Sequence, residues 1–348
     1  MPIFTCALLA LLLASLPASA QSAFSMGGVT AQPGTLTSGT FHIAARVGDQ
    51  GTEIPFSIVH GTKPGPVLAL VAGTHGMEYA PIVALQRLRR AIDPVTLAGT
   101  IVMVHVANMP SFLGRTIYYS PADGKNLNRV FPGKADGTLS ERIADVLTRE
   151  VIARATHVVD IHCGDGNESL RPYVYWIATG APEVAQAGRR LALASGFDHI
   201  VIDSGRPTDP AQSIYLSNTA ILRGKPALTV ESGYLAATDE DSIARIEHAV
   251  AGWLRELGMR TDGPPPVSTP IWIDRGEVLT SAATGIFYPA VERGHSVTAG
   301  TLIGRVTDFH GGVVQEVKAP FAGIVLYVLG TPPITKGEPV AFVGQIQK

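Results

Sequence analysis

A histidine and a glutamate stand three residues apart in VAGTHGMEYAP, residues 71–81, directly after an aliphatic run that is typical of a buried strand. Pro81 suits the first turn of a helix, where its missing N–H costs nothing, so we expect the helix to begin near Tyr79. Spaced three apart around one turn, the side chains of His75 and Glu78 can face one point above the end of the strand. The pair alone is compatible with a metal site and with the polar start of a surface helix.

A second histidine gives this pair more weight. His162 ends the apolar run VVDIH and precedes the glycine-rich segment CGDG, residues 163–166. Two histidines and one carboxylate at strand ends form the ligand set of a catalytic zinc site, whose fourth position is left for water. Alone, His162 would be interpreted as a buried histidine that is hydrogen-bonded within the sheet. Asp160 lies on the same face of this strand as His162. It is interpreted either as a carboxylate that orients a metal ligand or as an unrelated buried acid that is hydrogen-bonded by loop amides.

Hydrolysis of an amide at such a site also requires a base, which takes a proton from water and returns it to the leaving amine. Glu231 ends the apolar run LTVE. A carboxylate has no packing purpose at this position, so we predict that Glu231 is the base. A helix N-cap or a salt bridge is the alternative interpretation.

The segment between the second and third predicted strands, residues 108–133, is too long for an ordinary connection and is therefore a candidate functional loop. It contains Arg115 and Arg129. A fixed positive charge stabilises the oxyanion that develops in the transition state, and the arginine fork binds both oxygens of a carboxylate. The plain alternative for either residue is a solvated surface arginine.

Strand-like and helix-like stretches alternate between about residue 40 and residue 260. The strand-like runs are apolar on both faces, as in a sheet that is covered on two sides, and they span residues 66–73, 100–108, 156–164, 173–180 and 226–233. Amphipathic stretches between them predict helices at residues 80–92, 139–153, 182–195 and 239–257. The alternation predicts an α/β fold with a mixed, mostly parallel sheet flanked by helices.

The segment TDGPPPVSTP, residues 261–270, interrupts this alternation. Three consecutive prolines cannot continue a helix and favour an extended linker. We therefore predict a catalytic domain over residues 21–262 and an all-β domain over residues 263–348, in which no stretch is convincingly helical.

The predicted β domain repeats itself, because VTAG at residues 297–300 recurs as ITKG at residues 334–337. It resembles the barrel-sandwich hybrid of biotinyl and lipoyl carrier domains. A carrier needs a lysine at the tip of the hairpin that joins its halves, but this hairpin, TDFHGG, has none, and Lys318 lies away from the tip. We interpret the domain as structural or substrate-shaping, and not as a swinging arm.

The N-terminal residues 1–20 have an apolar stretch that closes on Ala-Ser-Ala, which predicts a signal peptide and an exported protein, periplasmic or secreted. The apolar stretch is shorter than a membrane span, so no membrane anchor is expected after cleavage. Cys163 is then the one remaining thiol, which excludes an intramolecular disulfide and a cysteine-based zinc site. A net charge of -2 without a basic stripe argues against nucleic acid as a partner.

Taken together and in this order, H-x-x-E, NLNRVFPG at residues 126–133, DIH and VESG resemble the succinylglutamate desuccinylase/aspartoacylase family, a branch of the zinc carboxypeptidase superfamily. The resemblance covers most of the chain and includes the layout with a C-terminal β domain. It implies a zinc carboxypeptidase-like catalytic fold. Asn126 departs from the pattern, because many relatives have an aspartate there.

The family's functional residues carry over onto the matching positions. The resemblance implies one zinc ion per chain, with three ligands, His75, Glu78 and His162. It implies further that Glu231 is the general acid and base and that Arg115 stabilises the oxyanion. The substrate carboxylate would be held by Asn128 and Arg129.

These features predict a zinc-dependent hydrolase that cleaves an amide bond in a small carboxylate-bearing substrate, of the N-acyl amino acid type. One rival is an exported carboxypeptidase that acts on short or cell-wall peptides with the same groups. Another is a non-catalytic protein that binds carboxylates. A serine hydrolase is disfavoured because G-x-S-x-G does not occur. Cys163 is disfavoured as a nucleophile because it is the strand neighbour of His162, and adjacent strand residues point to opposite faces.

Overall fold

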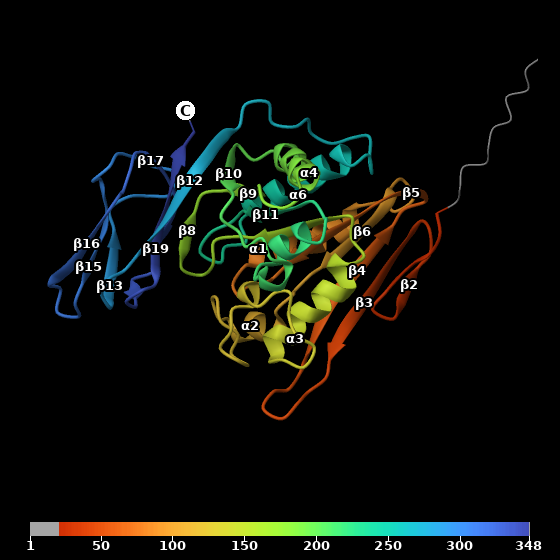
Figure 1. Cartoon of the computed structure of the whole chain (residues 1–348), viewed down its shortest axis with the longest axis horizontal. Helices are drawn as coiled ribbons and strands as arrows, with labels where there is room; N and C mark the ends of the chain where they lie inside the picture. Colours follow the sequence, from red (N-terminus) through yellow and green to blue (C-terminus); the bar gives the residue numbers. More distant parts are fainter. Residues whose placement is uncertain (1–20, 348) are drawn as a thin grey trace, which may run out of the picture.

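A computed structural model describes residues 21–347 of the chain and is shown in Figure 1. The predicted signal peptide, residues 1–20, lies outside the described residues and remains a prediction. None of the helices in residues 21–347 has the length and the apolar character that a membrane crossing requires.

A mixed sheet of 13 strands runs through the described chain. At its centre four strands lie side by side as parallel neighbours, in the order β11 (Ala227–Glu231), β7 (His157–His162), β5 (Lys63–Ala72) and β6 (Ala98–Val104). Beyond β6 the sheet continues with two antiparallel strands, β4 (Thr52–His60) and β3 (Thr35–Ile43). Beyond β11 follow β9 (Tyr173–Ile177), which is antiparallel to it, and β10 (His199–Asp203).

Helices cover both faces of this sheet. Alternate side chains of each strand point to opposite faces, so one strand contributes to an apolar cluster on each side. Leu68 and Leu70 of β5 belong to one apolar cluster, together with side chains of α1 (Tyr79–Ala91), α4 (Pro182–Ala194) and α6 (Glu240–Glu256). Ala69 and Val71 belong to another, together with side chains of α3 (Leu139–Val146) and α5 (Leu216–Ile221). The predicted α/β fold class is thereby confirmed.

One predicted helix changes its type along its length. The amphipathic stretch at residues 139–153 forms α3 only as far as Val146 and then continues as a π-helix, Leu147–Ile152. The shorter elements of this part are β1 (Phe24–Met26), β2 (Val29–Ala31), α2 (Met109–Gly114), η1 (Leu127–Arg129), β8 (Glu168–Leu170) and η3 (Pro210–Gln212).

The described residues after 270 form strands, and four of these, β12, β14, β17 and β19, continue the large sheet. β12 (Ile271–Thr280) pairs in parallel with β10 along one edge and antiparallel with β19 (Pro339–Ile346) along the other. β17 (Gly323–Leu329) and β14 (Ser296–Val297) complete this side, which is drawn in blue in Figure 1. A second sheet of four strands packs against them, and consists of β16 (Val313–Lys318), β15 (Leu302–Thr307), β13 (Gly285–Pro289) and β18 (Pro333–Ile334). The predicted boundary at residue 262 thus lies just before β12, a strand that pairs with strands of both parts of the chain.

The sequence repeat in this part corresponds to a structural repeat. VTAG begins in β14 and ITKG begins in β18, and each ends in a glycine with positive φ, 84° at Gly300 and 92° at Gly337. At this φ a side chain would be strained, which explains the glycines. The N–H that follows each glycine donates to a carbonyl three residues earlier, at 3.0 Å in both turns.

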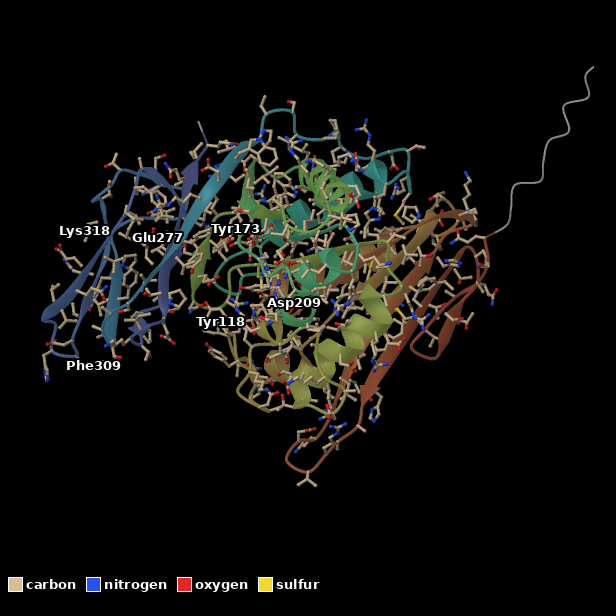
Figure 2. All side chains as sticks on the ribbon, viewed as in Figure 1. Tyr118, Tyr173, Asp209, Glu277, Phe309 and Lys318 are labelled. Carbon is tan, nitrogen blue, oxygen red and sulfur yellow. The ribbon has the colours of Figure 1, made fainter. Side chains whose placement is uncertain are left out.

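The hairpin that joins β15 and β16 has no lysine at its tip. Phe309 lies there with 73% of its surface exposed. Lys318 lies at the other end of β16 (Figure 2) and forms an ion pair with Glu316 at 2.9 Å. This geometry agrees with the interpretation of the β domain as something other than a carrier of a swinging arm.

Candidate active site

Three neighbouring parallel strands carry polar side chains where they end, at the edge of an α/β sheet where ligands bind. His75 lies in the turn after β5, His162 is the last residue of β7, and Glu231 is the last residue of β11. β7 and β11 are paired so that Glu231 lies directly opposite His162. Glu78 is the N-cap residue of α1. The fold thus brings together four residues that are far apart in the sequence.

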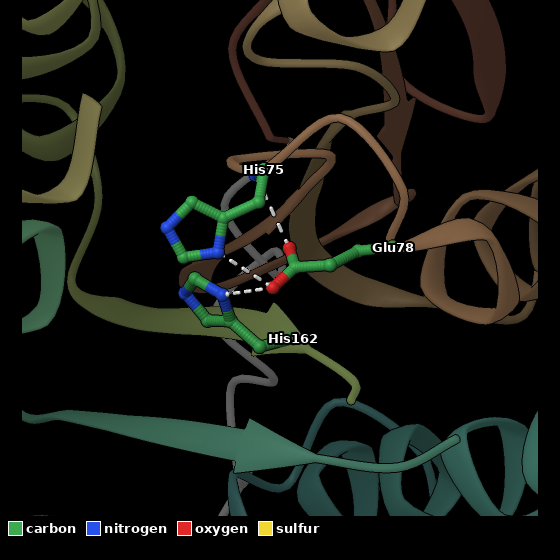
Figure 3. Close-up of side chains that lie close together, drawn as sticks. All are labelled: His75, Glu78 and His162. Carbon is green, nitrogen blue, oxygen red and sulfur yellow. Dashed lines mark hydrogen bonds and ion pairs between the residues drawn. The ribbon is translucent and has the colours of Figure 1, made fainter. Parts of the chain in front are cut away.

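Among the three predicted metal ligands, His75 and His162 both contact one carboxylate oxygen of Glu78, as Figure 3 shows. Oε1 of Glu78 lies 2.8 Å from Nδ1 of His75 and 2.8 Å from Nδ1 of His162. One ligand atom of each residue lies within 4.8 Å of the other two, and the three side chains are 11%, 1% and 4% exposed, in the order His75, Glu78 and His162. Two imidazole nitrogens and a carboxylate oxygen are donors that zinc accepts. The residues present therefore fit a zinc ion.

The pKa values of these groups reflect their mutual contacts. Burial lowers the pKa of His75, but the carboxylates of Glu78 and Asp165 together outweigh this effect and the pKa rises to about 10. Burial raises the pKa of Glu78, but the two histidines outweigh this effect and the pKa falls to about 2. The carboxylate therefore remains ionised and favours positive charge at the centre of the cluster, which a divalent cation supplies.

The outward nitrogens of both histidines have acceptors of their own. Nε2 of His162 donates to Oδ2 of Asp160 at 2.9 Å, and Nε2 of His75 donates to Oδ1 of Asn126 at 3.2 Å. A proton that is held on Nε2 leaves the lone pair of Nδ1 free for a metal. Of the two interpretations of Asp160, the structure supports the carboxylate that orients a ligand, and Asn126 serves His75 in the same way.

Asn128 stands behind this arrangement. Its Nδ2 donates to Oδ2 of Asp160 at 3.0 Å, and its Oδ1 accepts the N–H of Leu216 at 2.8 Å. Both ends of the amide are thus engaged by protein groups. Asn128 therefore supports Asp160 and also lines the cavity, and its predicted contact with a substrate carboxylate remains a prediction.

The two predicted arginines differ in position. Arg115 caps the C-terminus of α2 with a φ of 50° and is exposed. Among the described residues it is not part of the lining of the cavity that contains the ligands. The oxyanion role of Arg115 remains a prediction. Arg129 lines the cavity, and its guanidinium carbon lies 4.7 Å from the centre of the Tyr215 ring.

Glu231 faces the same cavity as the ligands. Burial raises the pKa of its carboxyl group well above the ordinary value, and the nearby Glu78 carboxylate raises it further. A raised pKa brings a carboxyl group closer to proton exchange at neutral pH, as an acid and base requires. Burial also raises the pKa of the neighbouring Cys163 thiol, which disfavours the thiolate and agrees with the rejection of Cys163 as a nucleophile.

A cavity of about 1130 Å³ lies over these residues. One wall comes from the catalytic part, including the long loop between α2 and α3. The opposite wall comes from the C-terminal strands and their turns, through Val278, Tyr327, Leu329, Ile334 and Glu338. The β domain therefore contributes directly to the candidate active site.

Four cavity residues escaped the sequence reasoning. Asp165 lies in the loop after β7, which the glycine-rich CGDG had marked only in general terms, and Glu168 is the first residue of β8. The hydroxyl of Tyr118 donates to Oε1 of Glu168 at 2.7 Å. Arg206 stacks on the Tyr215 ring at 4.0 Å and forms an ion pair with Asp203. Nothing in the spacing of Tyr118 or Arg206 indicated that these side chains turn inward.

The matched sequence and this geometry define the family. The catalytic-domain profile of the succinylglutamate desuccinylase/aspartoacylase family matches residues 64–257, more than half of the chain. The match contains β5, β7 and β11 with the four residues at their ends. The chain therefore belongs to the succinylglutamate desuccinylase/aspartoacylase family, as the sequence motifs predicted.

Similar proteins span nearly the whole chain. It is 29% identical over 304 residues to the N-alpha-acetyl-L-2,4-diaminobutyric acid deacetylase of Halomonas elongata, a match that covers 84% of this chain and 86% of that protein. The structure resembles the product-bound ectoine utilization protein EutE of Ruegeria pomeroyi, with a TM-score of 0.78, 25% identity and coverage of 89% and 95%. It also resembles a succinylglutamate desuccinylase of a Silicibacter species, with a TM-score of 0.80, 22% identity and coverage of 96% and 100%. At that identity the likeness concerns the fold alone.

Proposed function

We propose that the protein is a zinc-dependent hydrolase that cleaves the amide bond of an N-acyl amino acid. The observation that carries this proposal is the convergence of His75, Glu78 and His162 beside Glu231, in a cavity of about 1130 Å³. Family membership and the similarity to a deacetylase of an N-acetylated amino acid support it.

The protein's own residues have separable tasks in this reaction. A bound zinc ion would polarise the scissile carbonyl and lower the pKa of water to about 7. Asp160 and Asn126 keep the Nε2 protons on the two histidines and so direct both Nδ1 lone pairs at the metal position. Glu231 takes a proton from the attacking water and returns it to the leaving amine. Its place opposite His162 in the sheet fixes it beside the ligands.

The carboxylate of the substrate has a matching cation. Arg129 lines the cavity, and among its contacts in the described residues is the carbonyl of Asn128, to which Nη1 donates at 2.8 Å. Stacking on Tyr215 holds the planar guanidinium in place. An arginine fixed in this way binds both oxygens of a carboxylate. Arg129 is therefore the proposed anchor for the amino acid end of the substrate.

The proposal is tested with purified protein. We expect about one zinc ion per chain by metal analysis, and release of free amino acids from N-acetyl amino acids. Glu231→Gln should retain the zinc and lose about 10²- to 10⁴-fold in kcat. Glu277→Gln is the matched control, because Glu277 lies on β12 (Figure 2), its side chain is 44% exposed, and it is not among the described residues that line the cavity.

The rival functions give different outcomes in the same assays. Removal of C-terminal residues from free peptides, without any deacylation, would establish the carboxypeptidase. Tight binding of carboxylates without turnover of any N-acyl or peptide substrate would establish the binding protein. Full activity of Glu231→Gln would remove Glu231 from its proposed role.

A further inference from the structure

The segment that follows Glu231, residues 232–237, contains two neighbouring residues in a strained backbone conformation. Leu235 and Ala236 have φ values of 49° and 54°, in the left-handed region that residues other than glycine rarely adopt. Such a conformation costs free energy, so it persists only where the surrounding structure holds it. The segment joins Glu231, at the end of β11, to α6. We therefore looked for the contacts that hold it.

Backbone hydrogen bonds connect this segment to the residues that follow β7. The N–H of Gly164 donates to the carbonyl of Gly233 at 3.0 Å, and the N–H of Leu235 donates to the carbonyl of Glu168 at 2.9 Å. Glu168 lines the cavity on one side of the segment, and Glu231 lines it on the other. A movement of the segment would therefore reach the candidate active site at both residues.

The β domain holds a side chain of the same segment. The guanidinium carbon of Arg293 lies 3.5 Å from the centre of the Tyr234 ring, and the other guanidinium–ring distances in residues 21–347 are 4.0 Å or more. A cation at this distance is attracted to the face of the ring. Arg293 lies in the turn between β13 and β14, where the N–H of Gly294 donates to the carbonyl of Val325 on β17 at 2.7 Å. The position of Tyr234 thus depends on a turn that β17 fixes.

A second contact from the β domain reaches the next residue. Gly330 directly follows β17, and a Cβ atom at this position would lie 2.8 Å from Cδ2 of Leu235, which is too close for a side chain. The N–H of Gly330 donates to the carbonyl of Asn167 at 2.8 Å and so fixes this approach. The β domain thus contacts two successive residues of the segment, Tyr234 and Leu235.

We propose that Arg293 and Tyr234 form a clamp through which the β domain positions Glu231 for proton transfer. This inference rests on the proposed deacylase function. Among the described residues, neither member of the clamp lines the cavity, so both are positioning residues that do not touch the substrate. Without the clamp the strained segment relaxes, and the end of β11 moves with it. Proton transfer is sensitive to this movement, because a misplacement of about 1 Å can cost about 10²-fold in rate.

Substitutions of both members test the effect of the clamp on catalysis. The substrate is the N-acetyl-L-amino acid that wild type cleaves fastest. We expect Arg293→Ala to lower kcat by at least about tenfold, while KM stays within about threefold of wild type and the zinc content is unchanged. Tyr234→Leu should have the same effect. Tyr234→Phe retains the aromatic ring and should keep kcat within about threefold of wild type.

Arg305→Ala is the matched control for Arg293→Ala. The guanidinium carbon of Arg305 lies 5.8 Å from the centre of the Tyr288 ring, within the β domain, and neither residue is among the described residues of the cavity lining. Arg305→Ala should therefore retain the kcat of wild type. An equal loss of kcat in Arg305→Ala and Arg293→Ala would overturn the proposal, because any disturbance of the β domain would then have the same effect.

A double-mutant cycle shows whether the two members act together. If the ring and the guanidinium form one clamp, Arg293→Ala combined with Tyr234→Leu should lower kcat no further than either single variant does. A loss equal to the product of the two single losses would show that the residues act separately and would overturn the proposal. Wild-type kcat in Arg293→Ala would overturn it as well.

Hydrogen exchange, measured by mass spectrometry, tests the clamp without turnover. In Arg293→Ala and in Tyr234→Leu, the amides of residues 232–240 should exchange at least about tenfold faster than in wild type. In Arg305→Ala they should exchange at the rate of wild type. Unchanged exchange in both clamp variants would show that the β domain does not hold the segment.

The two measurements also separate this inference from the function on which it rests. If wild type hydrolyses no N-acyl amino acid, the deacylase is wrong, and the exchange rates still decide whether the clamp exists. If wild type is active and the clamp variants exchange faster without any loss of kcat, the deacylase stands and the positioning of Glu231 by the clamp is wrong.

Discussion

Asp160 determines which nitrogen of His162 is available to a metal. In Asp160→Asn, the new amide N–H can donate to Nε2, which moves the imidazole proton to Nδ1, the atom that faces the other ligands. We expect the affinity for zinc to fall by about 10- to 100-fold while the fold persists. Competition with a chromophoric chelator measures this affinity. Asp262→Asn, at an exposed ion pair with Arg260, is the control, and equal affinities in the two variants would contradict the role of Asp160.

The protonation of Glu231 sets the acid limit of activity. Burial raises the pKa of its carboxyl group well above the ordinary value of 4.5. Because only the carboxylate accepts a proton, activity should be lost as the pH falls through this raised pKa. We therefore expect the acid limb of the kcat/KM profile, measured with saturating zinc, to lie above pH 4.5. An acid limb at or below that value would show that another group controls the protonation step.

Some site residues were predictable from local sequence and others were not. His75 and Glu78 share one turn after a buried strand, so their spacing already fixes their relative position. His162 and Glu231 end apolar runs, which indicates the same sheet edge. The position of Arg115 outside the cavity lining was not predictable, because it follows from a left-handed cap at the end of α2. The partners of Asn128 could not be found either, since they come from distant segments.

Among the secondary structure elements, α3 holds the long cavity loop in place through Glu141. Its Oε2 accepts the N–H of Thr138 at 2.9 Å, and its Oε1 lies 3.1 Å from Nζ of Lys125. Glu141→Ala removes this cap, so we expect the free energy of unfolding to fall by about 1 kcal/mol, as measured by urea denaturation. Glu150→Ala, at exposed ion pairs with Arg149 and Arg154, should change it less.

The same contact has a defined pH dependence. The Thr138 N–H lowers the pKa of Glu141 in the folded protein. A lowered pKa means that the stabilisation is present above the unfolded value and is lost as the pH falls through the folded value. The difference between wild type and Glu141→Ala should therefore shrink in acid. A difference that stays constant down to the folded pKa would contradict an ionic cap.

The strands show how far periodicity predicts a sheet. Strands that are buried on both faces, such as β5 and β7, were found because their apolar runs are continuous. β3 escaped because it is an edge strand, and most of its residues are at least partly exposed, so only Phe41 and Ile43 reach the core. β10 was missed because its five residues end in a polar, half-buried Asp203. Tertiary contacts and not local pattern define these strands.

At the scale of the whole molecule, the cavity is closed by two parts of the chain that the sequence presents as separate domains. The prolines at residues 264–266 predicted the break, and the glycine repeat predicted the two β halves. The wall that these halves give to the cavity was not predictable, because it depends on the pairing of β12 with β10 and of β8 with β17. Both pairings join residues that are remote in sequence.

The C-terminal wall should limit the size of the acyl group. Val278 on β12 lines the cavity and is 50% exposed, so a larger side chain fits there without disturbing a core. We expect Val278→Trp to lower kcat/KM for a long-chain N-acyl amino acid by at least about tenfold relative to the N-acetyl compound. Val314→Trp is a matched control, because Val314 is also 50% exposed and lies outside the cavity lining. Equal ratios in both variants would separate the β domain from substrate selection.

The short strand β8 gives the C-terminal domain a second influence on chemistry. Its first residue, Glu168, is hydrogen-bonded within the ladder that joins it to Leu329 of β17. Substitutions in the C-terminal strands can therefore shift Glu168, a residue of the cavity lining, without replacing it. The shape of the candidate active site thus depends on a domain that, by sequence, resembles an accessory.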